Sequence, residues 1–305
     1  MKRVLITGAG GQLAIELSRW APEDVDVTAL DIGQLDITSS AQIDATFARV
    51  RPQVVFNAAA YTAVDLAEKE PEAAERINHR AVDLLRTACD GHSARLIHVS
   101  TDYVFDGLSP RPYLASDVSN PLSVYGRTKR DGEIAALRSA SSLVVRTAWL
   151  YGAHGKNFMR TMIRLMQERN ATGGEVRVVA DQIGTPTTAA GLARALWALE
   201  AKGASGVHHW TDAGVASWYD FAVAIGEEAA AIGLGTDHAR VTPIRSIDYP
   251  TPARRPTRGV LSKDATWSLL GAPSVHWREG LRETLSEFAS FSHAHSIGST
   301  TKGTS

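Results

Sequence analysis

The sequence has 305 residues, of which 44% are hydrophobic, a formal net charge of -1 at pH 7 and a single cysteine, Cys89. Such a chain can bury a substantial core and is longer than one typical domain requires, so we expect two lobes. The near-zero net charge excludes a general electrostatic attraction to nucleic acid or anionic lipid. A single cysteine excludes an intramolecular disulfide and fits a reducing compartment.

The first residues predict no targeting segment. Met1-Lys2-Arg3 leads straight into a short apolar run and a glycine turn, unlike a secretion signal. No apolar run in the sequence approaches membrane-spanning length. We therefore expect a soluble, cytoplasmic protein that has neither a membrane nor a nucleic acid among its partners.

The first half of the chain alternates short β-rich runs with longer helical patterns. This alternation is typical of an α/β fold with a Rossmann-type, doubly wound parallel sheet covered by helices on both faces. Pro71 suits the first turn of a helix, where its missing amide proton has no partner anyway. We expect residues 1–150 to form this domain. Its expected strands are 4–6, 25–30, 54–57, 96–100 and 143–147, and its expected helices are 12–20, 39–50, 71–89 and 124–137.

Beyond Tyr151 the pattern loosens into loops with frequent glycine and proline. We expect a smaller, discontinuous second lobe over residues 151–290, with residues 187–213 packing back on the first domain. The end of the chain, residues 291–305, is rich in Ser, Thr, Gly and His without apolar periodicity, which predicts a flexible tail. Helical patterns in this half occur at 158–167, 189–199, 218–231 and 277–288.

A glycine-rich loop follows the first expected strand. In Thr7-Gly8-Ala9-Gly10-Gly11-Gln12-Leu13-Ala14 the glycines allow a tight turn, so that backbone amides at a helix start can approach a pyrophosphate. Asp31 ends the next expected strand, where a carboxylate receives the adenosine ribose hydroxyls. No Arg or Lys follows Asp31 directly, which favours NADH over NADPH. Alternatively, Asp31 is a turn residue that ends a strand.

Tyr125 and Lys129 lie four residues apart in Val-Tyr-Gly-Arg-Thr-Lys. Residues with this spacing share one face of a helix and can point into one cleft. A tyrosine ionises near pH ~10 and a neighbouring cation favours the phenolate, so the pair predicts a proton donor whose pKa is lowered toward neutrality. Downstream of a nucleotide-binding loop, such a pair suggests hydride transfer to a carbonyl. Taken alone, the pair also fits an ordinary exposed helix.

Several blocks, in chain order, resemble one enzyme family. Gly8-x-x-Gly11, Ser100-Thr101-Asp102 and Tyr125-x-x-x-Lys129 resemble the extended short-chain dehydrogenase/reductases. A closer resemblance, covering most of residues 1–290, is to the dTDP-4-dehydrorhamnose reductases. It is carried by NAAAYTAVD at 57–65, STDYVFDG at 100–107, RTAWLYG at 146–152, GKNF at 155–158 and YPTPARRP at 249–256.

The resemblance implies an oxidoreductase that uses NADH or NADPH to reduce the C4 carbonyl of dTDP-4-dehydro-β-L-rhamnose to dTDP-β-L-rhamnose. That reaction is the last step in making activated rhamnose for bacterial surface polysaccharides such as lipopolysaccharide. By resemblance, Tyr125 donates a proton to the carbonyl oxygen and Thr101 hydrogen-bonds the same oxygen. Lys129 is implied to lower the pKa of Tyr125 and to hold the nicotinamide ribose. The protein's own task is then alignment and electrostatic preparation.

The same resemblance assigns the binding residues. Trp149 by itself also fits ordinary core at a strand end, and the adjacent Arg254 and Arg255 also fit a solvated turn. The residues implied for the cofactor are Gly8, Gly11, Gln12, Leu13, Asp31, Asp36, Ile37, Ala60, Tyr61, Thr62, Tyr125 and Lys129. The residues implied for the dTDP-sugar are Thr101, Asp102, Trp149, Asn157, Thr185 and Arg255.

The sequence disfavours a metal-bridged dimer. Some members of this family dimerise around a magnesium ion held by glutamates of both subunits, and Glu16 and Glu287 lie near positions that could contribute. However, the segment 186–191 has no carboxylate where another is expected, and hard divalent ions require several oxygen ligands. We therefore expect no essential metal, and a monomer or weak homodimer.

Other functions use the same architecture. A sugar-nucleotide dehydratase usually carries Thr-Asp-Glu, whereas Thr101-Asp102-Tyr103 lacks the second carboxylate. An epimerase, or a reductase of another dTDP-4-keto-6-deoxysugar, is harder to separate because stereochemistry depends on how the sugar lies against the nicotinamide. A non-catalytic, nucleotide-binding regulatory subunit is disfavoured because Thr101, Tyr125 and Lys129 are all present.

Overall fold

The computed structural model describes residues 1–299, with side chains as far as Phe291. Its main sheet contains six parallel strands in the order β10-β5-β4-β3-β1-β2. The predicted Rossmann-type parallel sheet is confirmed, and all five strands expected in the first half belong to it. The strands are β1 (Lys2–Thr7), β2 (Val25–Leu30), β3 (Val54–Asn57), β4 (Arg95–Thr101), β5 (Leu143–Thr147) and β10 (Gly206–His209).

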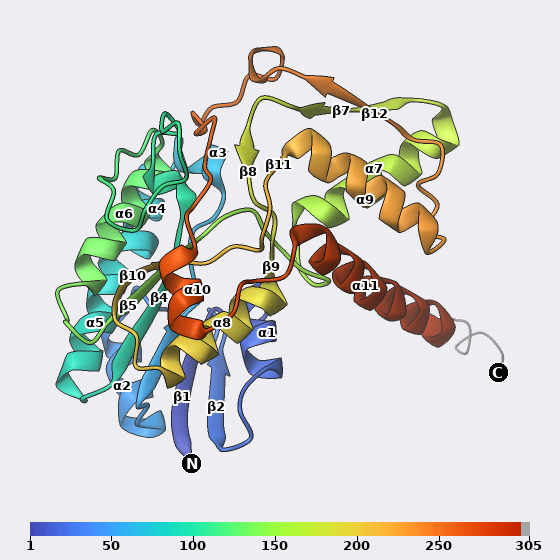
Figure 1. Ribbon diagram of the computed structural model, residues 1–305. Coiled ribbons are helices and arrows are strands. Elements are labelled where there is room, and N and C mark those ends of the chain that lie inside the picture. Colours follow the sequence, from blue (N-terminus) through green and yellow to red (C-terminus); the bar gives the residue numbers. More distant parts are fainter. Residues whose placement is uncertain (300–305) are drawn as a thin grey trace.

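The central strands β1, β3, β4 and β5 of this sheet are largely buried on both faces. In β1, Val4 and Ile6 belong to the core on one face and Leu5 to the core on the other. This pattern produces a continuous hydrophobic run, as expected for a parallel sheet covered on both sides. Helices α1 (Gln12–Arg19) and α8 (Ala189–Ala201) cover one face, whereas α2 (Ser40–Val50) and α5 (Ala81–Gly91) cover the other (Figure 1).

The predicted helix over 71–89 contains an interruption that the sequence pattern did not reveal. It consists of α4 (Pro71–Glu75), a π-helical turn η1 (Arg76–Arg80) and α5, with Pro71 in the first turn as expected. The wider turn places Asn78 inside, where its amide donates to Tyr61 O at 3.0 Å and accepts from Tyr61 N at 2.8 Å. The insertion therefore fixes the loop that follows β3.

The second lobe has its own core. Helices α7 (Phe158–Thr172), α9 (Trp218–Ala231) and α11 (Trp277–Ser299) pack together with a two-stranded parallel sheet, β7 (Glu175–Val179) and β12 (Arg240–Ile244). Figure 1 shows α7, α9, β7 and β12 beyond the upper end of the main sheet, with α11 descending on the right. Its core includes Met159, Met162, Met166, Phe221 and Leu281.

Residues 187–213 return to the first lobe. Strand β10 pairs in parallel with β5, and α8 packs against α1. Trp197 of α8 donates a hydrogen bond from Nε1 to Leu17 O at 2.9 Å. The chain therefore crosses from the sheet to the second lobe and back more than once, so the second lobe is not one continuous segment.

Two expectations for the second half are wrong. Helix α11 continues to Ser299 instead of ending at Phe288, because no proline or glycine occurs between Gly280 and Gly298. The tail predicted for 291–305 is therefore helical over 291–299, and residues 300–305 lie outside the described residues. Short elements were missed because two to seven residues show no clear period. These elements are α3 (Val64–Ala67), η2 (Asp102–Val104), β6 (Leu150–Tyr151), β8 (Ile183–Gly184), β9 (Thr187–Thr188), β11 (Ala216–Ser217), η3 (Ser246–Asp248) and α10 (Asp264–Leu270).

The helices of residues 1–299 do not meet the requirements for crossing a bilayer. None of these helices has both the length and the apolar character that a membrane span requires. The described amphipathic helices instead bury their apolar faces against the two cores.

Asp212 is a buried carboxylate at the start of α8. Its Oδ2 accepts from Thr188 N at 3.0 Å, whereas Oδ1 has no hydrogen-bond partner among the described residues. Burial raises the pKa of Asp212 from 3.8 to about 7. Because the folded state then holds this proton more tightly than the unfolded state, stability falls as pH rises between these two values.

Asp212→Asn removes this charge and keeps an oxygen for Thr188 N. We expect the substitution to raise Tm by about 3 °C or more near pH ~8 and to change Tm little near pH ~4, where the wild-type side chain is largely protonated. Scanning calorimetry at both pH values measures the difference. An equal change at the two values would show that burial of the charge is not the cause.

Candidate active site

A cleft lies across the carboxyl ends of the parallel strands. Its walls include the loops that follow β1, β2, β3, β4 and β5, and the second lobe contributes residues 155–156 and Trp218. The strand order reverses between β1 and β3. In open α/β sheets, ligands bind outside the carboxyl ends of the strands at such a switch point.

The glycine loop between β1 and α1 forms one wall of the cleft. Gly8 has a φ of +76°, and a Cβ there would lie 2.9 Å from the backbone of Ala59, so only glycine fits. Helix α1 begins after Gly11 without a side-chain cap, which leaves its first amides available to an anion. The predicted residues Gly8, Gly11, Gln12 and Leu13 all line this wall, whose geometry fits a pyrophosphate.

Carboxylates line the end of the cleft beyond the glycine loop. The predicted residues Asp31, Asp36 and Ile37 all belong to this end. Asp31 Oδ1 accepts from Gln34 N at 3.1 Å. Hydrogen bonds from the backbone and hydroxyl of Thr38 lower the pKa of Asp36. Both side chains thus present oxygens suited to ribose or adenine donors.

Helix α6 (Val124–Ala136) packs closely on the turn η2 and so forms the opposite corner of the cleft. Ser123 caps α6 by accepting from Gly126 N at 3.1 Å. A Cβ on Gly126 would overlap Tyr103 O, so glycine is required for this approach. The rings of Tyr103 and Tyr125 meet edge to face, 5.5 Å between centroids. This packing holds Tyr125 against the end of β4.

Tyr125, Lys129 and Thr101 all line this corner. Burial raises the pKa of Tyr125 to about 12, with the hydroxyl of Thr101 acting in the opposite direction. The prediction that Lys129 lowers this pKa toward neutrality is therefore wrong in this structure. Lys129 Nζ hydrogen-bonds Val99 O at 2.6 Å and His98 Nε2 at 3.3 Å instead of Tyr125. A phenol with a raised pKa is protonated at neutral pH, as a proton donor must be.

Lys129 is itself strongly affected by burial. Its side chain is 2% exposed, and burial lowers the pKa of Lys129 to about 8, with Glu133 acting in the opposite direction. Glu133 pairs with Arg146 at 2.7 Å, and both are buried. The ammonium at the cleft corner therefore loses its proton at a much lower pH than an ordinary lysine.

Asp102 lies beside Tyr125 and Thr101. It accepts from the Thr101 hydroxyl at 3.0 Å and is 2% exposed. Burial raises the pKa of Asp102 from 3.8 to about 7, whereas the hydrogen bond from Thr101 lowers it. A carboxyl group that is partly protonated at neutral pH can both donate to and accept from a sugar hydroxyl.

Trp149 forms an aromatic wall of the cleft. Its φ of +47° is uncommon for a bulky residue, and its indole stacks on Trp218 with ring centroids 3.6 Å apart. Gly184 lies against the same indole, because a Cβ there would approach Trp149 Cε2 to 2.6 Å. Trp149 is half-buried and lines the cleft, so it is not simply part of the core.

Ala60 and Thr62 line the cleft as predicted, but two other predicted residues do not. Tyr61 donates its hydroxyl to Glu70 Oε2 at 2.8 Å. Thr185 is 1% exposed and donates to Gly214 O at 3.0 Å. Their polar groups are used within the protein, and their roles in ligand binding stay predictions.

Asn157 and Arg255 also lie outside the lining of the cleft. Asn157 caps α7 and donates from Nδ2 to Gly152 O at 2.8 Å. Arg255 forms a two-point ion pair with Asp65, with Nη2 to Oδ2 at 2.7 Å, while Arg254 is exposed. The structure therefore brings Thr101, Asp102 and Trp149 together but leaves the other substrate assignments as predictions.

Four charged or aromatic residues of the cleft were not assigned from the sequence, and one of them is Tyr103. Arg76 enters from the π-helical turn, which no sequence pattern marked. Lys156 lies in the GKNF block, and its positive charge is the signal that could have identified it as a residue of the cleft. Trp218 is the first residue of α9 and lines the cleft. The capping box formed by Ser217 and Asp220 marks the start of this helix.

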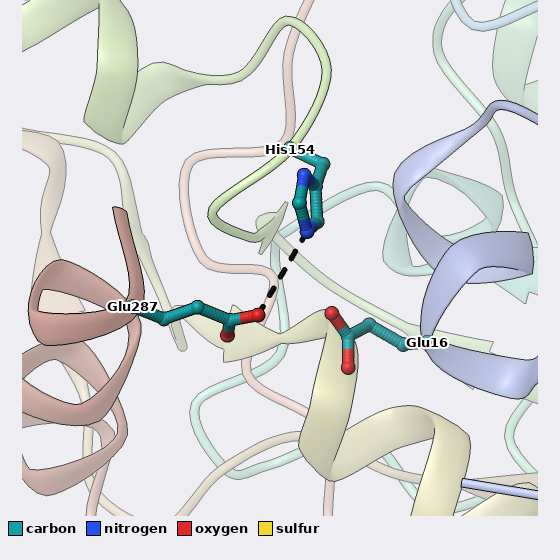
Figure 2. A group of neighbouring side chains, drawn as sticks. All are labelled: Glu16, His154 and Glu287. Carbon is teal, nitrogen blue, oxygen red and sulfur yellow. Dashed lines mark ion pairs between the residues drawn. The ribbon is translucent and has the colours of Figure 1, made fainter. Parts of the chain in front are cut away.

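Glu16, His154 and Glu287 form a cluster outside the cleft (Figure 2). They come from α1, the loop after β6 and α11, and one ligand atom of each lies within 4.8 Å of the others. His154 Nε2 is 3.8 Å from Glu287 Oε1, and Arg19 Nη1 pairs with the same oxygen. The two glutamates considered in the sequence are thus neighbours, and Arg19 lies within ion-pair distance of both, with Nη1 3.9 Å from Glu16 Oε2.

Comparison with known proteins gives consistent results. Residues 1–290 match the family described as the RmlD substrate binding domain. The chain is 40% identical over 291 residues to a dTDP-4-dehydrorhamnose reductase of Aggregatibacter actinomycetemcomitans, covering 92% of this chain and 98% of the relative. It is 44% identical over 296 residues to a probable dTDP-4,6-dihydroxy-2-methyloxan-3-one 4-ketoreductase of Streptomyces antibioticus, covering 95% and 97%. The crystal structure of a dTDP-4-dehydrorhamnose reductase from Bacillus anthracis in complex with NADP is similar, with 35% identity, a TM-score of 0.88 and coverage of 94% and 100%.

Proposed function

We propose that this chain is an NAD(P)H-dependent oxidoreductase that acts on a dTDP-sugar. The reason is that the chain belongs to the family of the RmlD substrate binding domain and the dTDP-4-dehydrorhamnose reductases. The substrate we infer is dTDP-4-dehydro-β-L-rhamnose, reduced at C4 to dTDP-β-L-rhamnose. One observation supports the proposal most directly: Tyr125, Thr101 and Lys129 share one corner of a cleft whose other wall is a glycine loop.

The residues of the cleft fit a nicotinamide dinucleotide. The uncapped first turn of α1, beside Gly8 and Gly11, offers backbone amides to the pyrophosphate. Asp31 offers oxygens to the adenosine ribose, and Lys129 offers an ammonium to the nicotinamide ribose. When bound, the reduced nicotinamide supplies the hydride for C4 of the sugar.

The protein's contribution to the chemistry is a placed proton. Tyr125 donates its phenolic proton to the carbonyl oxygen as that oxygen gains negative charge. The Thr101 hydroxyl, which donates to Asp102 in this structure, turns its proton to the same oxygen. The raised pKa of Tyr125 keeps its proton in place until the oxygen becomes the stronger base. Asp102 and Trp149 hold the sugar from the adjacent walls of the cleft.

The function is tested by identifying the product. The purified protein is incubated with dTDP-4-dehydro-6-deoxyglucose, a 3,5-epimerase and either NADH or NADPH, and the sugar is identified by NMR. We expect dTDP-β-L-rhamnose, with NADH modestly preferred because no cation follows Asp31 directly. Failure to oxidise either cofactor with any dTDP-4-keto-6-deoxyhexose would refute a catalytic function.

A second candidate is reduction of a different dTDP-4-keto-6-deoxysugar. The observation that favours it is the 44% identity to the Streptomyces antibioticus protein named as a 4-ketoreductase. The same assay without the 3,5-epimerase separates the two. Turnover that is equally fast without the epimerase would favour the second candidate, whereas dependence on the epimerase supports reduction of the rhamnose precursor.

We also propose that the enzyme needs no metal and is a monomer or weak homodimer. The segment 186–191 has no carboxylate, and Arg19 occupies one oxygen of Glu287 in the cluster of Figure 2. Gel filtration with and without EDTA, followed by an activity assay, should give the same elution volume and rate. Dissociation of a dimer by the chelator would contradict this expectation.

A further inference from the structure

His98 is buried directly beneath the candidate active site. It lies in the middle of β4, is fully buried, and does not line the cleft. Lys129 reaches down from α6, and its Nζ lies 3.3 Å from His98 Nε2 and 2.6 Å from Val99 O. Gly132, one turn further along α6, lies beside this ring, and a Cβ there would overlap Asn78 O. The imidazole thus contacts two residues that line the cleft, Lys129 through Nε2 and Asn57 through Nδ1.

The other ring nitrogen connects His98 to the neighbouring strands. Asn57 Nδ2, at the end of β3, lies 3.1 Å from His98 Nδ1. Asn57 Oδ1 in turn accepts from the Thr7 hydroxyl, at the end of β1, at 2.7 Å. These side chains form a buried line from the glycine loop to Lys129, across three adjacent strands of the sheet.

The charge on Lys129 determines which tautomer of His98 fits. An ammonium has three N–H donors and no acceptor, so Nε2 accepts from it only if the proton of the neutral ring is on Nδ1. Nδ1 must then donate to the Asn57 oxygen. Rotating the side-chain amide of Asn57 by half a turn exchanges its oxygen and nitrogen without changing the space that it fills. The oxygen then faces His98 Nδ1, and the nitrogen faces the Thr7 hydroxyl, whose oxygen can accept a hydrogen bond from it. Both ring nitrogens of His98 and the oxygen of the Asn57 amide are then paired.

We propose that His98 is a positioning residue for Lys129: its Nε2, together with Val99 O, takes two of the three ammonium protons and directs the third into the cleft. The proposal rests on the proposed function only for its kinetic consequences. A lysine on a flexible four-carbon chain otherwise has many rotamers, and ordering it in advance removes this entropy cost from cofactor binding. The groups facing His98 are Lys129 from α6, with the ion pair of Glu133 and Arg146 beyond it, and Asn57 from β3.

Two substitutions of similar size separate the two ring nitrogens. The amide of Gln reaches the position of Nε2, so His98→Gln keeps an acceptor for Lys129. Asn reaches only the position of Nδ1, so His98→Asn keeps the contact to Asn57 and loses the contact to Lys129. Each substitution replaces a buried ring with a smaller polar group, so their costs in stability should be comparable and are measured as Tm.

The expected results differ between the two variants. His98→Asn should lower kcat/KM for the cofactor by about 10- to 100-fold, the range for loss of a hydrogen bond to a charged group, whereas His98→Gln should stay within about threefold of wild type. In His98→Asn the alkaline decline of kcat/KM should also begin at a lower pH, because the charged form of Lys129 has lost an acceptor and its pKa falls. Equal rates and equal pH profiles in the two variants would overturn the proposal.

A measurement on the wild-type protein covers the case in which the variants do not fold. The ¹⁵N-labelled imidazole signals of the protein report which ring nitrogen carries the proton, and the His98 signal is identified as the one that shifts in Lys129→Met. We expect the proton on Nδ1, and a proton on Nε2 would overturn the proposal. This readout, like cofactor binding measured by NADH fluorescence, does not depend on turnover. It therefore tests His98 even if the proposed substrate proves wrong.

Discussion

Tyr125→Phe should lower kcat by about 10²- to 10⁴-fold, the contribution typical of a positioned general acid, and leave cofactor affinity nearly unchanged. The phenylalanine ring preserves the edge-to-face contact with Tyr103 and removes only the hydroxyl. Without that proton, the oxygen at C4 must take its proton from water or from a weaker neighbour. Single-turnover oxidation of NADH at saturating dTDP-sugar measures the chemical step directly.

Tyr151→Phe is the matched control for this prediction. Tyr151 is fully buried, whereas Tyr125 is partly buried, and it lies in the core of the second lobe, where its hydroxyl donates to Trp277 O at 3.4 Å. Its loss should change Tm more than the rate of turnover. If Tyr125→Phe retained the wild-type rate, or if both variants lost the same activity, Tyr125 would not be the acid.

The main sheet could be predicted because its strands carry their signal locally. The central strands β1, β3, β4 and β5 are short, largely buried runs such as Val4-Leu5-Ile6, and amphipathic helices such as α1, α2 and α5 separate strands of the sheet along the chain. The strands β6, β8, β9 and β11 have two residues each. They form only because distant segments bring them together, and no local pattern contains that information.

The same distinction applies to the candidate site. The glycine loop was predictable because backbone geometry at Gly8 requires glycine and leaves a visible motif. The pKa of Tyr125 was not predictable from the sequence. The spacing shows that Lys129 shares a helix face with Tyr125, but it does not show that the ammonium hydrogen-bonds Val99 O and His98 instead of the phenol. Burial then dominates, and it acts in the opposite direction on the tyrosine.

Lys129→Met should weaken cofactor binding and lower kcat together, by about 10- to 100-fold each, because it removes a charged donor from both the bound ribose and the reacting corner. Methionine fills a similar volume, so the packing of α6 on β4 is largely preserved. The pH profile gives the sharper test. Burial lowers the pKa of Lys129 to about 8, so in the wild type kcat/KM for the cofactor should decline as pH rises through this value and the ammonium is lost.

In Lys129→Met this alkaline decline should disappear, since no group in the corner then loses a positive charge in that range. Lys263→Met is the matched control, because burial also lowers the pKa of Lys263, which lies against Trp267 outside the lining of the cleft. That variant should lose stability but keep the wild-type profile. A decline that persisted unchanged in Lys129→Met would have to come from another group, and the ammonium would then have no electrostatic part in catalysis.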